Sequence, residues 1–242
     1  MVPDGVTAVV THVIDGDTLE VRTEEGDLTV RLAGINAPEE RECHAGPAVD
    51  RLHGTLDGVE VTLDLVGFDQ FGRSLAYVFD ESMNINLEMV TLGLALAATP
   101  GEDDPQGPAL IDAEQAAFDA RVGLWALDAC GRGENLPRLT FDMAASQPDP
   151  PGPDEQALDE EIVIIANMGS ETIDLSGWIV RDESSRHRFV FATGTSLSAG
   201  ESLAITSADD GWTPGASPVW NNGGDLALLQ DPNGTVVARW RY

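Results

Sequence analysis

Three short clusters of acids, amides and arginines in the first half of the chain could do chemistry together. They are Asp15-Gly16-Asp17-Thr18, then Arg31 with Asn36-Ala37-Pro38-Glu39, then Asp69-Gln70-Phe71-Gly72-Arg73. Each cluster has an ordinary interpretation by itself, since Asp-Gly favours a hairpin turn and either arginine could cap a turn or carry surface charge. Together they contain the groups that cleavage of a phosphodiester requires.

That reaction needs a hard cation on oxygen ligands, an oriented water molecule, and fixed donors for the phosphate oxygens as negative charge builds. Carboxylates and an amide can supply the ligands and orient the water. Arginine suits the donor role better than lysine, because its planar guanidinium meets two phosphate oxygens at once and stays charged. The residues therefore predict metal-assisted phosphodiester hydrolysis if the fold brings the clusters together.

The patterns around these clusters predict a small α+β barrel. Apolar runs between turn signals predict strands at 6–14, 19–22, 28–32, 59–65 and 74–79. Apolar residues at helical spacing predict helices at 86–94 and 109–122, and Ala116, Ala117 and Ala120 favour the second of them. Strands followed by helices within one core are typical of this class.

A proline-rich polar stretch at 146–153 divides the sequence. We expect a first domain at 1–142, an acidic linker at 143–159 and a second domain at 160–242. Short strand-like runs separated by turns, with no competing helical pattern, predict a β-sandwich for the second domain. Four of the five tryptophans lie there, and we interpret them as core residues.

The formal net charge of -29 is unusual for a protein that must approach a polyanion. All 13 basic residues are arginine, and the acids are scattered along the chain. We interpret this surface as an adaptation to concentrated salt, where the Debye length falls to about 3 Å at 1 M and long-range repulsion disappears. The alternative is that the acids bind cations or basic partners.

Cys43 and Cys130 are too few and too far apart for a C-x-x-C metal or redox motif. A disulfide, which requires an oxidising compartment, and two separate buried thiols both remain open. No apolar run approaches the roughly 20 residues that span a bilayer, so we expect no transmembrane segment. The first residues lack a basic start and an apolar stretch, so a secretory signal is either absent or already removed.

Residues 5–130 resemble the staphylococcal nuclease (thermonuclease) family. The segments that carry the resemblance agree with it in order and spacing, and they are Val13–Thr18, Val30–Glu39, Phe71–Val78 and Val122–Trp125. The resemblance implies an OB-fold barrel capped by helices. It also implies Ca²⁺-dependent cleavage of DNA and RNA that leaves 3′-phosphate ends.

The resemblance further implies a role for individual residues. Asp17, the Asn36 side chain and the Ala37 carbonyl would bind Ca²⁺, with Asp15 and Glu39 acting through water. Glu39 would also orient or deprotonate the attacking water, and the phosphate would be held by Arg31 and Arg73. Related exported members look similar at both cysteine positions, so the resemblance favours a disulfide between Cys43 and Cys130 and an extracellular or cell-surface location.

Two positions depart from the family pattern. Asn36 stands where the best-known enzyme of the family has an aspartate, although other members have Asn there, and the loss of one negative charge predicts weaker calcium binding. Thr99 and Gly101 stand where that enzyme has two substrate-stacking tyrosines. Because base stacking is worth about 1 to 3 kcal/mol per base, we expect a changed affinity or substrate preference.

The segment from Glu161 to Tyr242 resembles a lamin tail domain, an immunoglobulin-like sandwich. The resemblance lies in runs such as Asp174-Leu175-Ser176-Gly177-Trp178 and Val219-Trp220-Asn221-Asn222-Gly223-Gly224-Asp225. It contains no catalytic grouping, and at family level it implies binding to a protein, envelope or nucleic-acid partner. We expect a monomer.

Our leading hypothesis is therefore an exported, salt-adapted, Ca²⁺-dependent nuclease that the second domain positions or tethers. One rival is a non-catalytic binding protein that keeps the barrel without the chemistry. Retention of Asp17, Glu39, Arg31 and Arg73 argues against it, because a binder has little use for all four. Another rival makes the sandwich the principal actor, as an envelope adhesion module.

Overall fold

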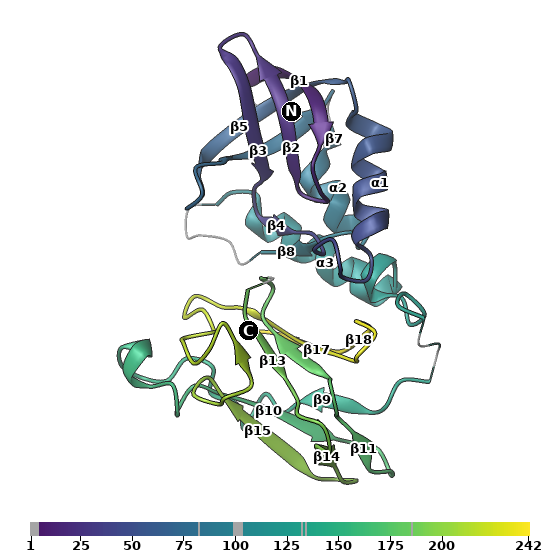
Figure 1. The fold of residues 1–242 in the computed structure, drawn as a ribbon, viewed down its shortest axis with the longest axis vertical. Coiled ribbons are helices and arrows are strands. Elements are labelled where there is room, and N and C mark those ends of the chain that lie inside the picture. The colour runs from purple at the N-terminus through teal and green to yellow at the C-terminus, as the bar shows by residue number, and fades with distance from the viewer. Residues whose placement is uncertain (1–4, 82, 99–103, 132, 134, 185) are drawn as a thin grey trace. The chain divides into compact units, whose positions relative to one another are not determined.

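The computed structural model describes residues 5–81, 83–98, 104–131, 133, 135–184 and 186–242. The chain divides into two compact units, of which the first ends at Ala126 and the second runs from Leu127 to Tyr242 (Figure 1). Thr99 and Gly101, where the family pattern is broken, lie outside the described residues.

The first unit is a closed β-barrel. Its strands are β1 (Val6–Val13), β2 (Thr18–Thr23), β3 (Gly26–Leu32), β5 (Glu60–Phe68), β6 (Ser74–Asp80) and β7 (Met83–Asn84), paired in the order β3-β2-β1-β5-β6-β7. The sheet closes because β3 also pairs in parallel with β6. Each of the five predicted strands corresponds to one of these elements, which confirms the barrel.

Three helices cover the barrel: α1 (Ala45–Leu56), α2 (Ile85–Thr91) and α3 (Gly107–Ala120), and a 3₁₀ turn, η1 (Gly123–Trp125), follows. The sequence pattern predicted α2 and α3 but missed α1. Gly46, Pro47 and Gly54 weaken the helical pattern of that segment. The helix forms nevertheless, because Pro47 lies in the first turn, where a missing N–H costs little, and the face with Leu52 and Leu56 is buried.

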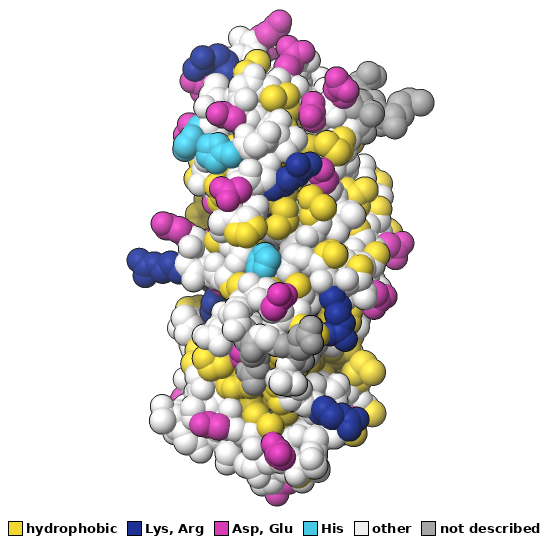
Figure 2. Space-filling model, turned by 90° about the vertical axis from the view of Figure 1, so that its right-hand side faces the viewer, with side chains coloured by type: hydrophobic (Ala, Val, Ile, Leu, Met, Phe, Trp, Pro, Cys, Tyr) yellow, Lys and Arg dark blue, Asp and Glu magenta, His cyan; other side chains and the backbone are white. Residues whose placement is uncertain are grey.

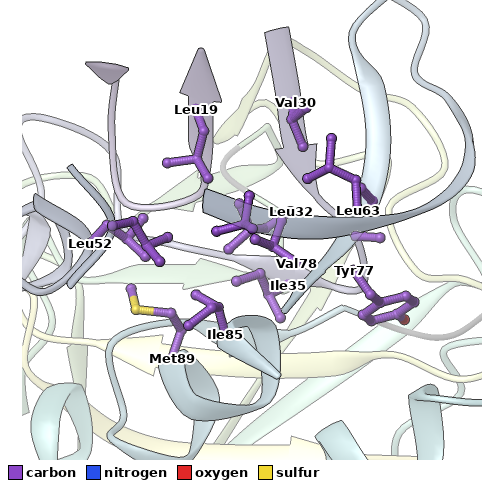
Figure 3. Close-up of a cluster of buried hydrophobic side chains, with 14 of the residues drawn as sticks. Leu19, Val30, Leu32, Ile35, Leu52, Leu63, Tyr77, Val78, Ile85 and Met89 are labelled. Atoms are coloured by element: carbon purple, nitrogen blue, oxygen red, sulfur yellow. The ribbon is translucent and has the colours of Figure 1, made fainter. Parts of the chain in front are cut away.

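The core lies between the barrel and the helices (Figure 3). Leu19 and Leu32 from the strands pack with Leu52 of α1 and with Ile85 and Met89 of α2, and each of these side chains is at most 1% exposed. Burying one such side chain stabilises a fold by roughly 1.5–3 kcal/mol. This core fixes the ends of β2 and β3, where the polar clusters lie.

Buried polar side chains fix the segments next to the clusters. Asn86 is fully buried on α2, where its Oδ1 accepts the Val78 N–H at 2.9 Å and its amide donates to the Ala33 carbonyl at 2.8 Å. The short strands β4 (Ile35–Asn36) and β8 (Leu96–Ala97) pair, and the carboxylate of buried Glu114 on α3 accepts the Ala97 N–H at 3.0 Å. These bonds hold β3 and β4 in place behind the site.

The second unit is entirely β apart from one 3₁₀ turn, η2 (Asp154–Gln156), in the part of it that is described. One sheet has the order β15 (Ser202–Thr206), β10 (Ile162–Asn167), β9 (Leu139–Phe141). A second has the order β16 (Trp212–Thr213), β13 (Arg188–Val190), β12 (Ile179–Arg181), β17 (Leu226–Gln230), β18 (Val236–Arg241). A two-stranded sheet joins β11 (Ile173–Asp174) to β14 (Ser196–Leu197). Trp178, Trp212 and Trp220 are 2–5% exposed in the core of this unit, as expected, whereas Trp240 is only partly buried and packs against that core.

The start of the second unit differs from the expected boundaries. We placed residues up to 142 in the first domain, yet β9 pairs with β10, and both Leu139 and Phe141 are buried in the second core. The expected linker at 143–159 also begins with structure, because Gln147 bridges to Ile162. We expected a linker because residues 146–153 are rich in proline. An edge segment of a sheet tolerates proline, so this composition does not exclude the bridge between Gln147 and Ile162.

Within the described residues, no helix combines the length and the apolar character that crossing a bilayer demands.

Candidate active site

The Asp15-Gly16-Asp17-Thr18 cluster forms the turn between β1 and β2. The Asp15 Oδ1 accepts the Asp17 N–H at 2.9 Å, so the first aspartate shapes the turn, and the second lies directly before β2, which begins at Thr18. Gly16 is required because a Cβ there would lie 2.7 Å from the Ala37 Cβ and 2.8 Å from the Ala48 Cβ. This close approach lets the Ala37 N–H donate to the Asp17 Oδ2 at 2.7 Å.

Arg31 joins the first cluster to the second. It lies on β3 directly opposite Thr18, so the ladder places its side chain beside Asp17. Its Nη1 lies 2.9 Å from the Asp17 Oδ2, and its Nη2 donates to the Asn36 Oδ1 at 2.7 Å. One guanidinium therefore bridges two of the oxygen atoms expected to bind metal, and Asp17 and Asn36 are close together as predicted.

Asp17 is 7% exposed. Burial raises the pKa of Asp17 to about 6, with Asp15 adding to the rise, while Arg31 and the Ala37 N–H oppose it. Burial therefore makes the charged form of Asp17 less favourable than it is in water, even with Arg31 beside it. A further positive charge nearby would stabilise that charged form.

Arg73 is held by Asp69, four residues before it. Its Nε lies 2.6 Å from the Asp69 Oδ2, and its Nη1 reaches the Thr18 Oγ1 at 3.4 Å. Although desolvation pulls the other way, the guanidinium of Arg73 and the N–H groups of Arg73 and Phe71 hold the pKa of Asp69 below its usual range. Asp69 therefore stays charged and aims Arg73 toward Thr18, the residue after Asp17.

The two arginines line one cavity of 260 Å³, together with Asn36, Asp69 and Phe71. Parallel pairing of β3 with β6 explains this, because Arg31 is directly opposite Leu75, two residues after Arg73. An open cavity with two guanidinium groups, in a chain of net charge -29, is suited to an anion such as a phosphodiester.

Glu39 is not joined to this group. It lies in the loop after β4 with an exposed side chain, and its N–H donates to the Glu42 carboxylate at 3.0 Å. Among the described residues, no hydrogen bond connects its carboxylate to Asp17, Arg31 or Arg73. The described part of the chain also holds no group of three or more His, Cys, Asp or Glu side chains able to bind a metal.

Both cysteines of the chain, Cys43 and Cys130, are disulfide-bonded in the structure.

Sequence reasoning gave Asp69 and Thr18 no role, yet both contact Arg73. A signal was present for Asp69, because an acid four residues before an arginine across a Gly-containing turn can form an ion pair within that turn. No sequence signal marks Thr18, whose contact depends on how the barrel closes.

Comparisons with known proteins identify the family of each unit. Residues 29–127 match the family described as staphylococcal nuclease homologue, and residues 144–242 match the lamin tail domain. An uncharacterized endonuclease of Escherichia coli O157:H7 is 32% identical over 117 residues, which cover 48% of this chain and 74% of that protein. The thermonuclease of Staphylococcus intermedius is 28% identical over 129 residues, covering 50% of this chain and 77% of the relative.

An uncharacterized endonuclease of Haemophilus influenzae is 36% identical over 121 residues, which cover 50% of this chain and 66% of that protein. Family match, relatives and barrel architecture point the same way. The chain therefore belongs to the staphylococcal nuclease homologues, with a lamin tail domain after its nuclease domain.

Proposed function

We propose that the first unit hydrolyses phosphodiester bonds of DNA and RNA as a Ca²⁺-dependent endonuclease that leaves 3′-phosphate ends. Membership of the nuclease family supports the reaction class. In this chain the proposal rests on one observation: Arg31 and Arg73 line the same cavity, and Arg31 binds both Asp17 and Asn36.

In this proposal the two arginines bind and stabilise the phosphate. A guanidinium has five N–H donors. Arg73 uses Nε for Asp69 and Nη1 for Thr18, so its orientation is set while further N–H groups can meet phosphate oxygens. Donors fixed in advance cost no reorganisation as charge develops in the transition state.

Glu39 is the proposed group for orienting or deprotonating the attacking water. It follows Asn36 and Ala37 in the same loop, and its carboxylate is open to water. Contacts of catalytic bases commonly tighten when substrate binds, so a loose position without substrate is compatible with this role.

The donor set fits calcium. Asp17, Asn36 and the Ala37 carbonyl would hold the ion, with Asp15 acting through water; all are hard oxygen donors of the kind Ca²⁺ prefers. Arg31 contacts both the Asp17 Oδ2 and the Asn36 Oδ1, so these two oxygen donors lie close together, and the ion would take them over from the guanidinium. When bound, the ion would neutralise phosphate charge and polarise a phosphoryl oxygen. An amide at Asn36 supplies one charge fewer than a carboxylate, so we expect weak calcium affinity.

We propose that the enzyme works in concentrated salt and outside the cell or on its surface. Figure 2 shows Asp and Glu side chains scattered over the visible face rather than gathered in one patch. A surface of this kind, with all 13 basic residues being arginine, supports solvation at high salt. The disulfide-bonded state of both cysteines supports an oxidising compartment.

For the second unit we propose a positioning or tethering role toward an envelope, protein or nucleic-acid partner, with the chain acting as a monomer. The match to the lamin tail domain supports a binding module rather than a second enzyme.

The deciding experiment measures release of acid-soluble nucleotides from single-stranded DNA in molar salt, first with calcium and then with a chelator. Calcium-dependent release that the chelator abolishes is expected. Absence of calcium-dependent release at every salt concentration would leave the non-catalytic binding protein as the better account. Phosphate at the 3′ rather than the 5′ end of the products, detected by mass spectrometry, checks the bond that breaks.

A further inference from the structure

We propose that His12 and His53 form a metal site of their own, which takes a divalent cation of the Zn²⁺ class and joins strand β1 to helix α1. Its protein ligands are ring nitrogens, whereas the donors proposed for calcium are oxygens. The inference does not depend on nuclease activity.

The two imidazole rings lie together at the surface of the barrel, although they are far apart in sequence. Their centres are 6.2 Å apart and their planes are inclined at 72°. Two imidazoles on one Zn²⁺, each with a Zn–N bond of about 2.0–2.1 Å, have ring centres roughly 5–6 Å apart. Both residues are exposed, and exposed side chains rotate freely. A small rotation would therefore let both rings bind one ion.

An irregularity in β1 turns His12 toward the surface. Ala8 and Val10 are buried, so regular alternation along the strand would bury His12 as well. The pairing of β1 with β2 instead shifts its register between Val10 and His12. Thr11 and His12 are both exposed as a result, and Val13 is buried. A bulge of this kind re-aims a side chain, and here it brings an imidazole to the side of the strand that α1 approaches.

Helix α1 presents the second ring from a fixed position. His53 lies in the last turn of the helix, which Leu52 and Leu56 anchor in the core. The same helix contacts the turn that follows β1, because a Cβ on Gly16 would lie 2.8 Å from the Ala48 Cβ. An ion that joins α1 to β1 would therefore brace the helix against the strand that leads into this turn.

The nitrogens of both rings are open to a ligand. Among the described residues, neither His12 nor His53 uses its ring in a hydrogen bond or an ion pair. Neutral imidazole is the ligand that Zn²⁺, Cu²⁺ and Ni²⁺ share.

Acids surround the pair and favour a cation over an anion. Glu20 is directly opposite His12 on β2, and Asp50 and Asp57 lie three residues before and four residues after His53. Figure 2 shows two adjacent His side chains on the surface with Asp and Glu side chains near them. Water would complete the coordination, because the described part of the chain holds no group of three such ligands.

The test measures Zn²⁺ binding to the tag-free full chain by isothermal titration calorimetry in the presence of excess Ca²⁺. His12→Gln and His53→Gln should each weaken binding by at least the roughly tenfold that loss of even an outer-shell partner costs. The double variant should be no weaker than either single variant, because one ring alone does not chelate. Zn²⁺ should also raise the midpoint of thermal unfolding of the wild type but not of these variants, since only the folded chain brings the rings together.

His187→Gln is the matched control. It removes a third imidazole, which lies in the second unit and contacts the Asp182 carboxylate, and it should leave the Zn²⁺ affinity unchanged. In the wild type, Zn²⁺ should shift the imidazole proton resonances of two of the four histidines in a nuclear magnetic resonance spectrum.

Four outcomes would overturn the inference. These are the absence of Zn²⁺ binding by the wild type, an affinity that neither His12→Gln nor His53→Gln changes, displacement of Zn²⁺ by Ca²⁺, and an equal loss in His187→Gln. Because both rings are exposed, the metal-free variants should unfold at the temperature of the wild type, and this comparison separates a lost ligand from a damaged fold. Nuclease activity enters none of these measurements, so failure of the proposed function would be a separate result.

Discussion

Both units of this chain contain buried carboxylates, and the partners of these carboxylates differ from site to site. In the barrel, buried Asp17 pairs with Arg31, which lines an open cavity, whereas buried Glu114 accepts the backbone N–H of Ala97. In the sandwich, buried acids accept backbone N–H groups of loops: Glu161 accepts from Trp220 at 2.9 Å, and Asp231 accepts from Thr235 at 2.9 Å. Burial of an acid is therefore no sign of a site by itself. What marks Asp17 is its ion pair with an arginine that lines an open cavity.

This comparison is tested most strongly by removing the arginines. Arg31→Ala and Arg73→Ala should each lower kcat on single-stranded DNA by on the order of 10²–10³-fold, as loss of a preorganised oxyanion donor does. Arg22→Ala is the control, because Arg22 pairs with Asp27 on the exposed surface of the same barrel and should leave kcat unchanged. Turnover that is the same in both site variants and the control would remove the assigned roles.

A smaller effect is expected for the residue that positions Arg73. Asp69→Asn keeps the shape of the turn but weakens the ion pair, so kcat should fall roughly tenfold as Arg73 loses its orientation. In a double-mutant cycle, Asp69→Asn should add little in the Arg73→Ala background. Full additivity would show that Asp69 acts independently of Arg73.

The smallest effect is expected in the sandwich and concerns stability alone. Burial, and then contact with Glu183, raise the pKa of Asp225 to about 9, against about 3.9 for an unfolded aspartate. The folded state therefore keeps a proton that the unfolded state releases, so the favourable contribution is complete below about pH 4 and is lost as pH rises toward 9. The midpoint of thermal unfolding of Asp225→Asn relative to wild type should be higher at pH 8 than at pH 5.

A difference between Asp225→Asn and wild type that is independent of pH would contradict that assignment. Asp174→Asn serves as its control, since hydrogen bonds from Ser176 lower the pKa of this exposed aspartate, so its contribution changes only below about pH 4 and its difference from wild type should be the same at pH 5 and at pH 8. Neither variant should change nuclease activity, because both lie in the unit without the cavity.

Much of the fold follows from local pattern, and part of the site does not. Alternation predicted the barrel strands, and helical spacing predicted α2 and α3, because these elements each bury one face. Helix α1 was not predicted, because its glycines and proline are unfavourable in a helix. It forms because burial of Leu52 and Leu56 in the core stabilises it. Strand β9 was not predicted, because it has only three residues and its partner, β10, is distant in sequence.

Within the site, the residue types of the three clusters suggested the chemistry, and the family resemblance singled out Asp17, Asn36 and the two arginines. The roles of Thr18 and Asp69 depend on where the closed barrel puts Arg73, which no local pattern encodes. The position of the Glu39 carboxylate depends on an exposed loop, and its catalytic role stays a prediction.

The most direct measurement is a crystal structure of the full chain grown with Ca²⁺ and a phosphorothioate dinucleotide. We predict one ion bound to Asp17, Asn36 and the Ala37 carbonyl, with the phosphorothioate between the guanidinium groups of Arg31 and Arg73. An ion bound elsewhere, or a nucleotide that leaves both arginines uncontacted, would contradict the account.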